Sequence, residues 1–353
     1  ERRRRRRTAL VLCALASALL MLPMPIATAF GALLALHGAL SIVHSAAGTP
    51  QRRAAGSPIE ESFPHLAGAY PGAAFLAEEG IAPLLEKTPR AALFSAAPHG
   101  ASAAMIDAVL STAEGTGTDL RAVDLSADFR FPTAEAYEKV YGHRHGAPRR
   151  LPEFLCTVPE AHDGASPRGA LPRHACQPGC FTTAVVLAAL PLLRLGLLGE
   201  PDLTAWAVTG STGAGREPKE TTHHPERQGN LFAYNPMSHR HEPEMRALLA
   251  GPSGAAPTVR FLPHAGPFAR GIYAAVRGTL AAGAAPAEVK GRVAAFYKDA
   301  PFVSVSDAPP RLKDVVGTNR CRLSVAAESD AVVVFSAIDN LVKGAAGGAV
   351  QWM

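Results

Sequence analysis

Short apolar runs and longer apolar stretches alternate along most of the 353-residue chain, and the two kinds predict different elements. Residues 91–95, 120–126 and 203–208 are short runs that end in polar or turn residues, so they predict buried strands. Residues 101–111 and 184–195 are longer apolar stretches, and their length predicts helices. This alternation of strands and helices runs from about residue 90 to residue 208.

The strand predicted at 91–95 continues into a loop that contains Pro98 and His99. In a doubly wound sheet, ligands bind beyond the carboxyl ends of the strands, so this loop is a candidate for ligand binding. A plain strand-ending turn is the alternative, and the pattern alone favours it.

The last part of the chain predicts another sheet. Apolar and polar residues alternate after Gly271, and residues 301–306, 321–325 and 331–336 predict further strands. Residues 286–297 predict a helix, because Pro286 suits a first helical turn.

Charge and cysteine content narrow the class of protein. The net charge is +5, but Arg2 to Arg7 supply six positive charges, so the rest of the chain is close to neutral. No basic patch indicates nucleic-acid binding. The five cysteines fit neither a disulfide framework nor a zinc ribbon, which favours reduced thiols in a cytosolic enzyme.

Cys180 is the candidate nucleophile. It follows a Pro-Gly turn and precedes the helix predicted at 184–195, so it lies where a helix begins. Backbone N–H groups and the helix dipole stabilise an anion there, which lowers the pKa of a thiol. The same N–H groups could hold the oxyanion of a tetrahedral intermediate. The alternative is a small buried hydrophobic residue, the commoner role of a cysteine.

Two histidines flank an arginine at His239, Arg240 and His241. Either histidine could accept the thiol proton, and Arg240 could bind a carboxylate or phosphate through its fork of donors. A metal site is the alternative, with His223 and His224 nearby, but no cysteine or carboxylate spacing matches a zinc pattern. The sequence therefore favours acid–base chemistry, and we expect no metal.

Several ordered motifs resemble those of the N-acetyl-gamma-glutamyl-phosphate reductase family. Residues 177–184 read Gln-Pro-Gly-Cys-Phe-Thr-Thr-Ala, with Gln177 where the family commonly has Asn or His. Residues 124–130 (Asp-Leu-Ser-Ala-Asp-Phe-Arg), 239–244 (His-Arg-His-Glu-Pro-Glu) and 338–347 also match. The glycine-rich loop at 209–216 stands where the family cradles cofactor and substrate.

The resemblance implies an α/β fold, with a Rossmann-type NADP-binding domain and an α+β catalytic and dimerisation domain of the semialdehyde dehydrogenase type. It implies NADPH-dependent reduction of N-acetyl-L-glutamyl 5-phosphate to the 5-semialdehyde, through a cysteine thioester, in L-arginine biosynthesis. The domains we expect are an anomalous stretch at 1–44, an NADP-binding domain at 45–178, a catalytic domain at 179–330, and a segment at 331–353 that returns to the NADP-binding domain.

The resemblance also implies site residues. The catalytic residues are Cys180, His239 and His241. The cofactor-binding residues are Ser45, Pro98, His99, Ser211, Gly213, Gly215, Arg216 and Asn340. The substrate-binding residues are Arg130, Glu160, Gln177, Arg240 and Arg270. We expect a cytoplasmic homo-oligomer, a dimer or tetramer, that acts on a small molecule and binds neither nucleic acid nor membrane.

The N-terminal stretch departs from the family. Arg2 to Arg7 precede an apolar run that continues to about Val43, and the family's glycine-rich phosphate loop is absent. A signal peptide or membrane anchor, a divergent phosphate loop, and a misread or frame-shifted start are the three interpretations. We favour the third, because the polarity changes abruptly while later motifs are intact. For the chain as written, residues 8–43 would either fill the first strand and helix of the sheet or stay detached from it.

Two other functions remain open. An aspartate-semialdehyde dehydrogenase-like enzyme would share the cysteine chemistry, but its histidine follows a different strand motif later in the chain. A non-catalytic product without the phosphate loop is the other.

Overall fold

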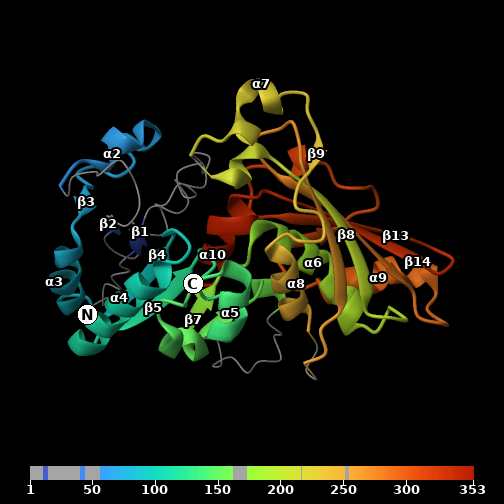
Figure 1. The fold of residues 1–353 in the computed structure, drawn as a ribbon, viewed down its shortest axis with the longest axis horizontal. Coiled ribbons are helices and arrows are strands. Elements are labelled where there is room, and N and C mark those ends of the chain that lie inside the picture. Colours follow the sequence, from blue (N-terminus) through green and yellow to red (C-terminus); the bar gives the residue numbers. More distant parts are fainter. Residues whose placement is uncertain (1–10, 15–39, 44–55, 162–172, 216, 251–253) are drawn as a thin grey trace, which may run out of the picture. The chain divides into compact units, whose positions relative to one another are not determined.

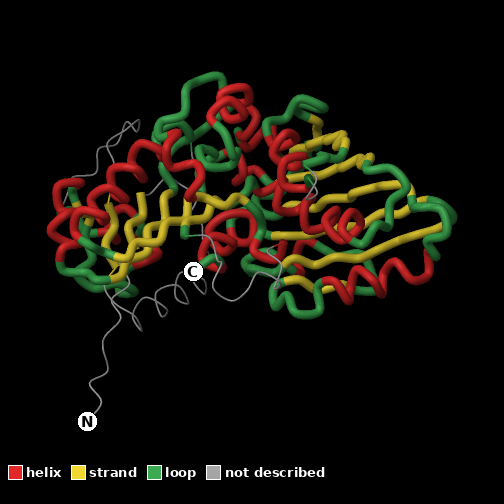
Figure 2. Tube along the Cα trace, turned by 90° about the horizontal axis from the view of Figure 1, so that it is seen from below, coloured by secondary structure: helices red, strands yellow, loops and turns green. Residues whose placement is uncertain are grey.

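The computed structural model describes residues 11–14, 40–43, 56–161, 173–215, 217–250 and 254–353, and Figure 1 shows their elements in chain order. Contacts divide the chain into two compact units, each with its own sheet. The first unit comprises residues up to Leu155, Leu171–Gln177 and Trp352–Met353. The second comprises Cys156–Ala170 and Pro178–Gln351. Figure 2 shows the strands of both sheets in yellow.

The sheet of the first unit has the strand order β3-β2-β1-β4-β5-β7-β6. The recorded pairs β1–β2, β2–β3, β1–β4, β4–β5 and β5–β7 are all parallel. The chain therefore builds outward in both directions from β1, and the order reverses between β1 and β4, as in a Rossmann-type fold. The strands are β1 Val11–Ala14, β2 Leu40–Val43, β3 Phe75–Leu76, β4 Arg90–Ser95, β5 Asp119–Asp124, β6 Phe154–Cys156 and β7 His174–Cys176.

Two strands of this sheet come from the apolar N-terminal stretch. Val11–Ala14 and Leu40–Val43 take the first two strand positions, and β1 pairs with β4 along its whole length. This is the arrangement in which the stretch supplies the start of the sheet. The residues between these strands, where a phosphate loop would lie, are outside the described residues.

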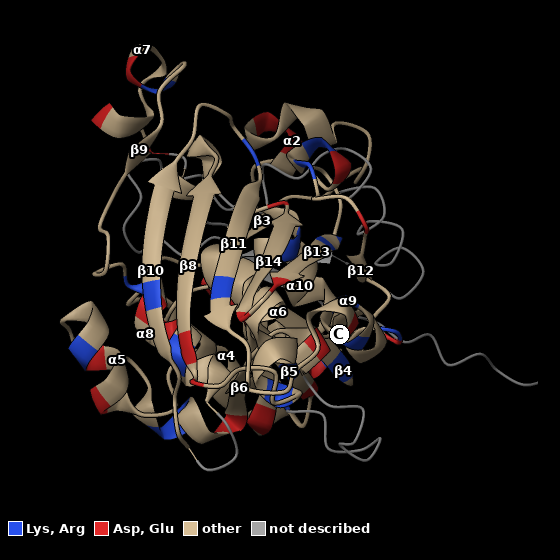
Figure 3. Cartoon of the chain, turned by 90° about the vertical axis from the view of Figure 1, so that its right-hand side faces the viewer, with Lys and Arg blue, Asp and Glu red and all other residues tan. Residues whose placement is uncertain are grey.

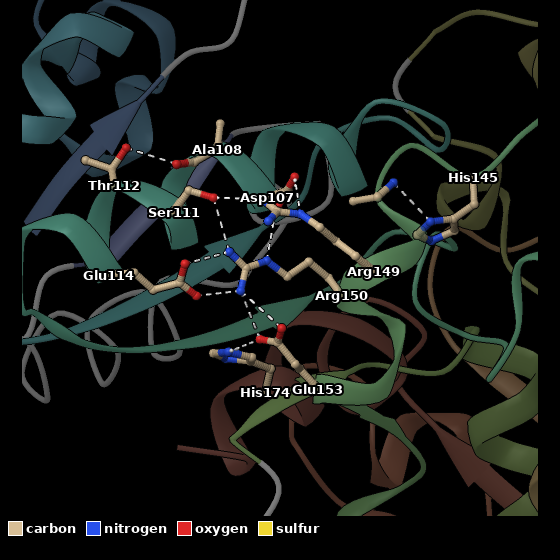
Figure 4. Close-up of polar contacts among 11 residues, drawn as sticks. Asp107, Ala108, Ser111, Thr112, Glu114, His145, Arg149, Arg150, Glu153 and His174 are labelled. Atoms are coloured by element: carbon tan, nitrogen blue, oxygen red, sulfur yellow. Dashed lines mark hydrogen bonds and ion pairs between the residues drawn. The ribbon is translucent and has the colours of Figure 1, made fainter.

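The longest helix described in the first unit, α4 (Ser102–Thr116), is tied to the 3₁₀ turn Pro148–Glu153 by Arg150. The side chain of Arg150 is 5% exposed and binds Asp107, Glu114 and Glu153 at 2.8, 2.5 and 3.1 Å. Figure 4 shows the three carboxylates around this guanidinium. The other helices and 3₁₀ turns are α2 Ile59–Ser62, η2 Pro64–Leu66, η3 Glu78–Gly80, α3 Ile81–Glu86 and α5 Ala134–Tyr141.

The second unit has a mixed sheet of order β12-β13-β14-β11-β8-β10-β9. Its strands are β8 Asp202–Thr209, β9 Phe232–Ala233, β10 Thr258–Ala265, β11 Ile272–Thr279, β12 Val303–Val305, β13 Cys321–Glu328 and β14 Ala331–Ile338. Its helices are α6 Cys180–Arg194, α7 His224–Arg227, α8 His241–Leu249, α9 Pro286–Phe296 and α10 Gly347–Gln351. Shorter helical turns are η5 Pro159–Ala161, η6 Ser211–Ala214, η7 Glu220–Thr222, η8 Leu312–Asp314 and the π-helical η9 Val342–Ala346.

Helix α6 forms the centre of the second unit's core. Its residues from Phe181 to Leu192 are buried, and it packs against β8, β11 and β14. Buried and half-buried positions alternate along β8 and β11, because successive side chains of a strand point to opposite faces. Trp206, Tyr273 and Phe335 are half-buried positions on these strands and on β14. Figure 3 views β10, β8, β11 and β14 from the face opposite α6.

These elements confirm the α/β fold class and the strands and helices that the sequence predicts. The helix expected at 184–195 begins earlier, at Cys180, and the strand expected at 301–306 is only Val303–Val305. Residues 331–351 group with the second unit, because β14 pairs with β11 and β13 over its full length. Within the described ranges, no helix is long and apolar enough to cross a membrane.

Candidate active site

Cys180 is the first residue of α6, at the amino end of the most deeply buried helix of the second unit. The preceding residue, Gly179, donates its backbone N–H to Oε1 of Glu244 at 2.7 Å, and Glu244 is fully buried. The carbonyl oxygen of Gly179 accepts from the backbone N–H of Thr183 at 2.8 Å. Both backbone groups of Gly179 are therefore held, which fixes the backbone that leads into Cys180.

Two glycines allow this corner to pack closely. A Cβ on Gly179 would lie 2.5 Å from Nε2 of His241, and a Cβ on Gly344 would lie 2.7 Å from Cβ of Cys180. Carbon atoms cannot approach that closely, so any larger side chain would displace its neighbour. His241 therefore packs directly beside the turn that carries Cys180, and η9 packs against Cys180 itself.

His239 is 8% exposed, and its ring has a defined tautomer. Its Nδ1 accepts the backbone N–H of His241 at 3.1 Å, so the proton of the neutral ring is on Nε2. Burial, and then the charge of Arg240, lower the pKa of His239 from 6.5 to about 4. His239 is thus a neutral hydrogen-bond donor at physiological pH. The edge-on rings of Phe181 and Tyr234 hold it in place.

A pocket of about 560 Å³ opens beside these residues within the second unit. Six predicted site residues line it: Cys180, Ser211, Gly213, His239, Arg240 and His241. Tyr234 also lines it, and burial together with the charge of Cys180 raises the pKa of this phenol. The pocket therefore combines a thiol, two imidazoles and cationic side chains, which suits attack on an anionic acyl group.

Asn340 and Arg270 do not line this pocket, and their side chains bind other residues of the second unit. Oδ1 of Asn340 accepts the backbone N–H of Gly271 at 2.7 Å, and its Nδ2 donates to Oγ1 of Thr212 at 3.1 Å. Nε of Arg270 lies 3.4 Å from Oδ2 of the buried Asp339. These bonds fix the turn at Gly271 against the glycine-rich loop.

Glu160 also lies away from the pocket lining. Its Oε1 is 2.5 Å from Nζ of Lys343, and the two side chains are 1% and 0% exposed. Gln351 donates to the same oxygen at 2.8 Å. Since Lys343 precedes Gly344, this buried pair anchors the segment that packs against Cys180.

The remaining predicted residues of the first unit lie near the carboxyl ends of its strands. Nδ1 of His99 accepts the backbone N–H of Ala127 at 2.9 Å. The buried Gln177 donates its backbone N–H to the carbonyl of Asp124 at 2.7 Å. Arg130, 7% exposed, donates to the carbonyl of Leu125 at 3.3 Å. Pro98 accepts the backbone N–H of Ala101 at 3.1 Å.

Gly215 has φ +90°, which favours glycine. Ser45 and Arg216, also predicted to bind cofactor, lie outside the described residues. Within the described ranges, no group of three or more His, Cys, Asp or Glu side chains could hold a metal ion.

Sequence reasoning missed three residues that shape the site: Glu244, Gly344 and Arg227. Glu244 stands inside a matched motif, but nothing in the sequence shows that its partner is the backbone of Gly179. Gly344 lies inside the matched motif at 338–347, but only its approach to Cys180 shows its role. Arg227 lies in none of the motifs that match the family, although it lines the pocket.

A parallel sheet that reverses order beside β1, joined to a mixed sheet with a cysteine at a helix start, defines the semialdehyde dehydrogenase class. A family model for the semialdehyde dehydrogenase dimerisation domain matches residues 180–340. The structure is also similar to aspartate semialdehyde dehydrogenase II from Vibrio cholerae, with a TM-score of 0.64 and 14% identity over 98% of this chain and 96% of that one.

Sequence comparison identifies the family. The chain is 40% identical to N-acetyl-gamma-glutamyl-phosphate reductase of Alkalilimnicola ehrlichii, covering 85% of this chain and 84% of the relative. It is 38% identical to the enzyme of that name from Methanopyrus kandleri, covering 86% and 84%. The chain belongs to the N-acetyl-gamma-glutamyl-phosphate reductase family, which confirms the resemblance seen in the sequence. It is an oxidoreductase of amino-acid biosynthesis with a pyridine nucleotide cofactor.

Proposed function

We propose that this enzyme reduces N-acetyl-L-glutamyl 5-phosphate to N-acetyl-L-glutamate 5-semialdehyde, with release of phosphate, as a step of L-arginine biosynthesis. The observation that carries the proposal is Cys180 at the start of α6, in a pocket shared with His239 and His241. A thiol at a helix start is a good nucleophile toward an acyl phosphate, and phosphate is a good leaving group.

The proposed cofactor is NADP, which when bound supplies the hydride for the acyl carbon. A parallel sheet whose order reverses between β1 and β4 fits a dinucleotide beyond its strand ends. The loop after β4, with Pro98 and His99, is where we expect the first unit to hold it. The choice of NADP over NAD rests on the family resemblance.

Cys180 and His241 do the chemistry in this proposal. His241 accepts the thiol proton, the thiolate bonds to the acyl carbon, and the carbon–oxygen bond to phosphate breaks, which leaves a thioester. As hydride adds to the thioester carbon, His241 returns its proton to the carbonyl oxygen. It takes that proton back when the carbon–sulfur bond breaks and the aldehyde leaves. His241 is assigned this role because its Nε2 packs against Gly179, next to the thiol.

His239 acts differently in the same scheme. Its Nδ1 is occupied by the backbone of His241, and it stays neutral above about pH 4, so it cannot accept the thiol proton through Nδ1. Its Nε2–H is a donor, which suits the oxygen that becomes negative at each tetrahedral stage.

Self-association is proposed through the sheet face opposite α6. Trp206, Tyr273 and Phe335 are half-buried there in a single chain, and the matched family model is a dimerisation domain. A second copy placed on this face would bury these rings. Sedimentation should show a dimer or tetramer for the wild type and a smaller species for Tyr273→Glu.

We also propose a cytoplasmic location, because NADPH and the acyl phosphate are cytosolic.

The direct test is the reverse reaction. N-acetylglutamate semialdehyde, phosphate and NADP⁺ should give NADPH, with turnover that requires phosphate. Aspartate semialdehyde under the same conditions should react at least about 100-fold less efficiently, because its chain is shorter and carries an amine. Preference for aspartate semialdehyde would favour the alternative enzyme, and inactivity toward both would favour a non-catalytic product.

A further inference from the structure

Three cationic side chains line the pocket beside Cys180: Lys219, Arg227 and Arg240. Lys219 and Arg240 are exposed to solvent, whereas Arg227 is 8% exposed. A buried charge normally has a partner of opposite sign, because desolvating it alone is costly. Arg227 is therefore the member of this set whose environment needs an explanation.

The contacts of Arg227 fix its guanidinium without neutralising it. Nη2 donates to the carbonyl oxygen of Thr209 at 3.0 Å, and the guanidinium carbon lies 5.6 Å from the ring centre of Phe232. Nε is buried and has no hydrogen-bond acceptor in the part of the chain that the structure describes. Among the described residues, no Asp or Glu forms an ion pair with Arg227, not even the adjacent Glu226. Burial accordingly lowers the pKa of Arg227.

Arg150 in the first unit is a buried arginine with a structural role, and its partners can be compared with those of Arg227. It is similarly buried, but three carboxylates surround it. Arg227 has a carbonyl and an aromatic ring instead, and it faces a pocket. An anionic ligand would supply the missing counter-charge.

We propose that Arg227 binds the carboxylate of the substrate, and that this contact selects N-acyl amino acid substrates over uncharged aldehydes. This rests on the proposed function, in which the substrate carries a carboxylate at one end and an acyl phosphate at the other. The planar fork of a fixed arginine suits a carboxylate. The exposed Lys219 and Arg240 suit the phosphate, which must exchange with solvent in every turnover.

The reverse reaction separates the two anions, because the carboxylate is on the aldehyde and the phosphate is a second substrate. For Arg227→Met we expect KM for N-acetylglutamate semialdehyde to rise about 10- to 100-fold, the loss typical of a hydrogen-bonded charge pair. KM for phosphate should change less than about twofold. Arg227→Lys should restore part of the loss, because it keeps the charge without the fork. An increase in KM for phosphate alone would overturn the proposal.

A carboxylate-free aldehyde controls for damage to the fold. 4-Acetamidobutanal is the same substrate without its carboxyl group, and kcat/KM for it should be nearly equal in wild type and Arg227→Met. An equal loss with both aldehydes would mean that Arg227 only supports the structure, and would overturn the proposal. Arg246→Gln, an exposed arginine on α8 outside the pocket lining, is the matched control and should change neither value. A wild type without phosphate-dependent turnover would instead overturn the proposed function, and this assignment with it.

Discussion

At the carboxyl ends of β4 and β5, the buried polar groups of the first unit form hydrogen bonds with other residues of that unit. Asp124 accepts hydrogen bonds from Ser102 and Ser126, and Asp128 accepts the backbone N–H groups of Gly100 and Ala103. In the pocket of the second unit, by contrast, the backbone N–H of His241 donates to Nδ1 of the buried His239, which leaves Nε2–H as a donor. The buried Arg227 has no carboxylate partner in the part of the chain that the structure describes.

The difference separates two kinds of motif that look alike in a sequence. Both regions have matched, polar residues at strand or helix ends. In the first unit Asp124 and Asp128 accept hydrogen bonds from neighbouring residues of the chain, so replacing either should change stability. In the second unit the matched residues face a pocket, so replacing them should change turnover.

The largest effect should come from Cys180→Ser. A hydroxyl is a far weaker nucleophile than a thiolate, so kcat should fall about 10⁴-fold or more, as for loss of other catalytic nucleophiles. Thermal unfolding should change little, because the two side chains are nearly isosteric. Cys176→Ser is the matched control, four residues away, and should keep most activity. Near-normal turnover of the Cys180 variant would contradict the mechanism.

Arg150→Met should affect stability alone. It leaves three carboxylates around an apolar side chain, and removing one partner of a buried ion pair costs about 3–5 kcal/mol. Because Glu114 is 54% exposed and can be rehydrated, we expect about 3 kcal/mol in urea unfolding. Arg149→Met removes an exposed pair to the same Asp107 and should cost less than about 1 kcal/mol. A loss of kcat in folded Arg150→Met would contradict a purely structural role for Arg150.

Much of the fold and of the candidate site could be predicted from the sequence, because the patterns that indicate them lie within short segments. The start of α6 at Cys180 follows from a Pro-Gly turn before an apolar run. The matched motif at 239–244 indicates that His239 and His241 belong to the same site. The contacts of Glu244 with Gly179 and of Gly344 with Cys180 join residues 65 and 164 positions apart. No local pattern encodes such distances, so these contacts needed the fold.

The same limit applies to the contacts that the predicted site residues make. Glu160, predicted to bind substrate, pairs with Lys343, which only the fold brings near. Polar residues beside a matched motif look equally functional in a sequence, whether they pair with the chain or face a ligand. The N-terminal stretch shows the reverse case, because its apolar composition resembles a membrane segment, yet β1 and β2 supply strands of the first unit's parallel sheet.

Asp124→Asn should change how stability depends on pH. Burial, and then the charge of Asp128, raise the pKa of Asp124 from 3.8 to about 6 in the folded state. Between these values the unfolded chain is deprotonated while the folded one holds its proton, so wild-type stability falls as pH rises from about 4 to 6. The Asn variant lacks this loss. Its stability relative to wild type should rise by up to about 3 kcal/mol over that range and then level off.

The control for this prediction is Asp119→Asn, an exposed carboxylate at the other end of β5. Urea unfolding at a series of pH values should give a flat difference for it. A flat difference for Asp124→Asn as well would show that the carboxylate is already ionised in the folded protein.

The smallest effect should come from His239→Asn, and it bears on how the two histidines divide their work. If His239 only donates a hydrogen bond from Nε2, its loss should lower kcat about tenfold, because an amide retains some donor capacity. The pH dependence of kcat between pH 5 and 8 should not change, because His239 titrates near pH 4. Stability should respond instead. In the wild type the folded state resists protonation of His239, so stability falls as pH drops from 6.5 toward 4, and the variant should lack that fall. His241→Asn is the matched comparison: it should lower kcat more and remove the limb of the pH profile that reports the base. If His239→Asn removed that limb and His241→Asn kept it, the two assignments would have to be exchanged.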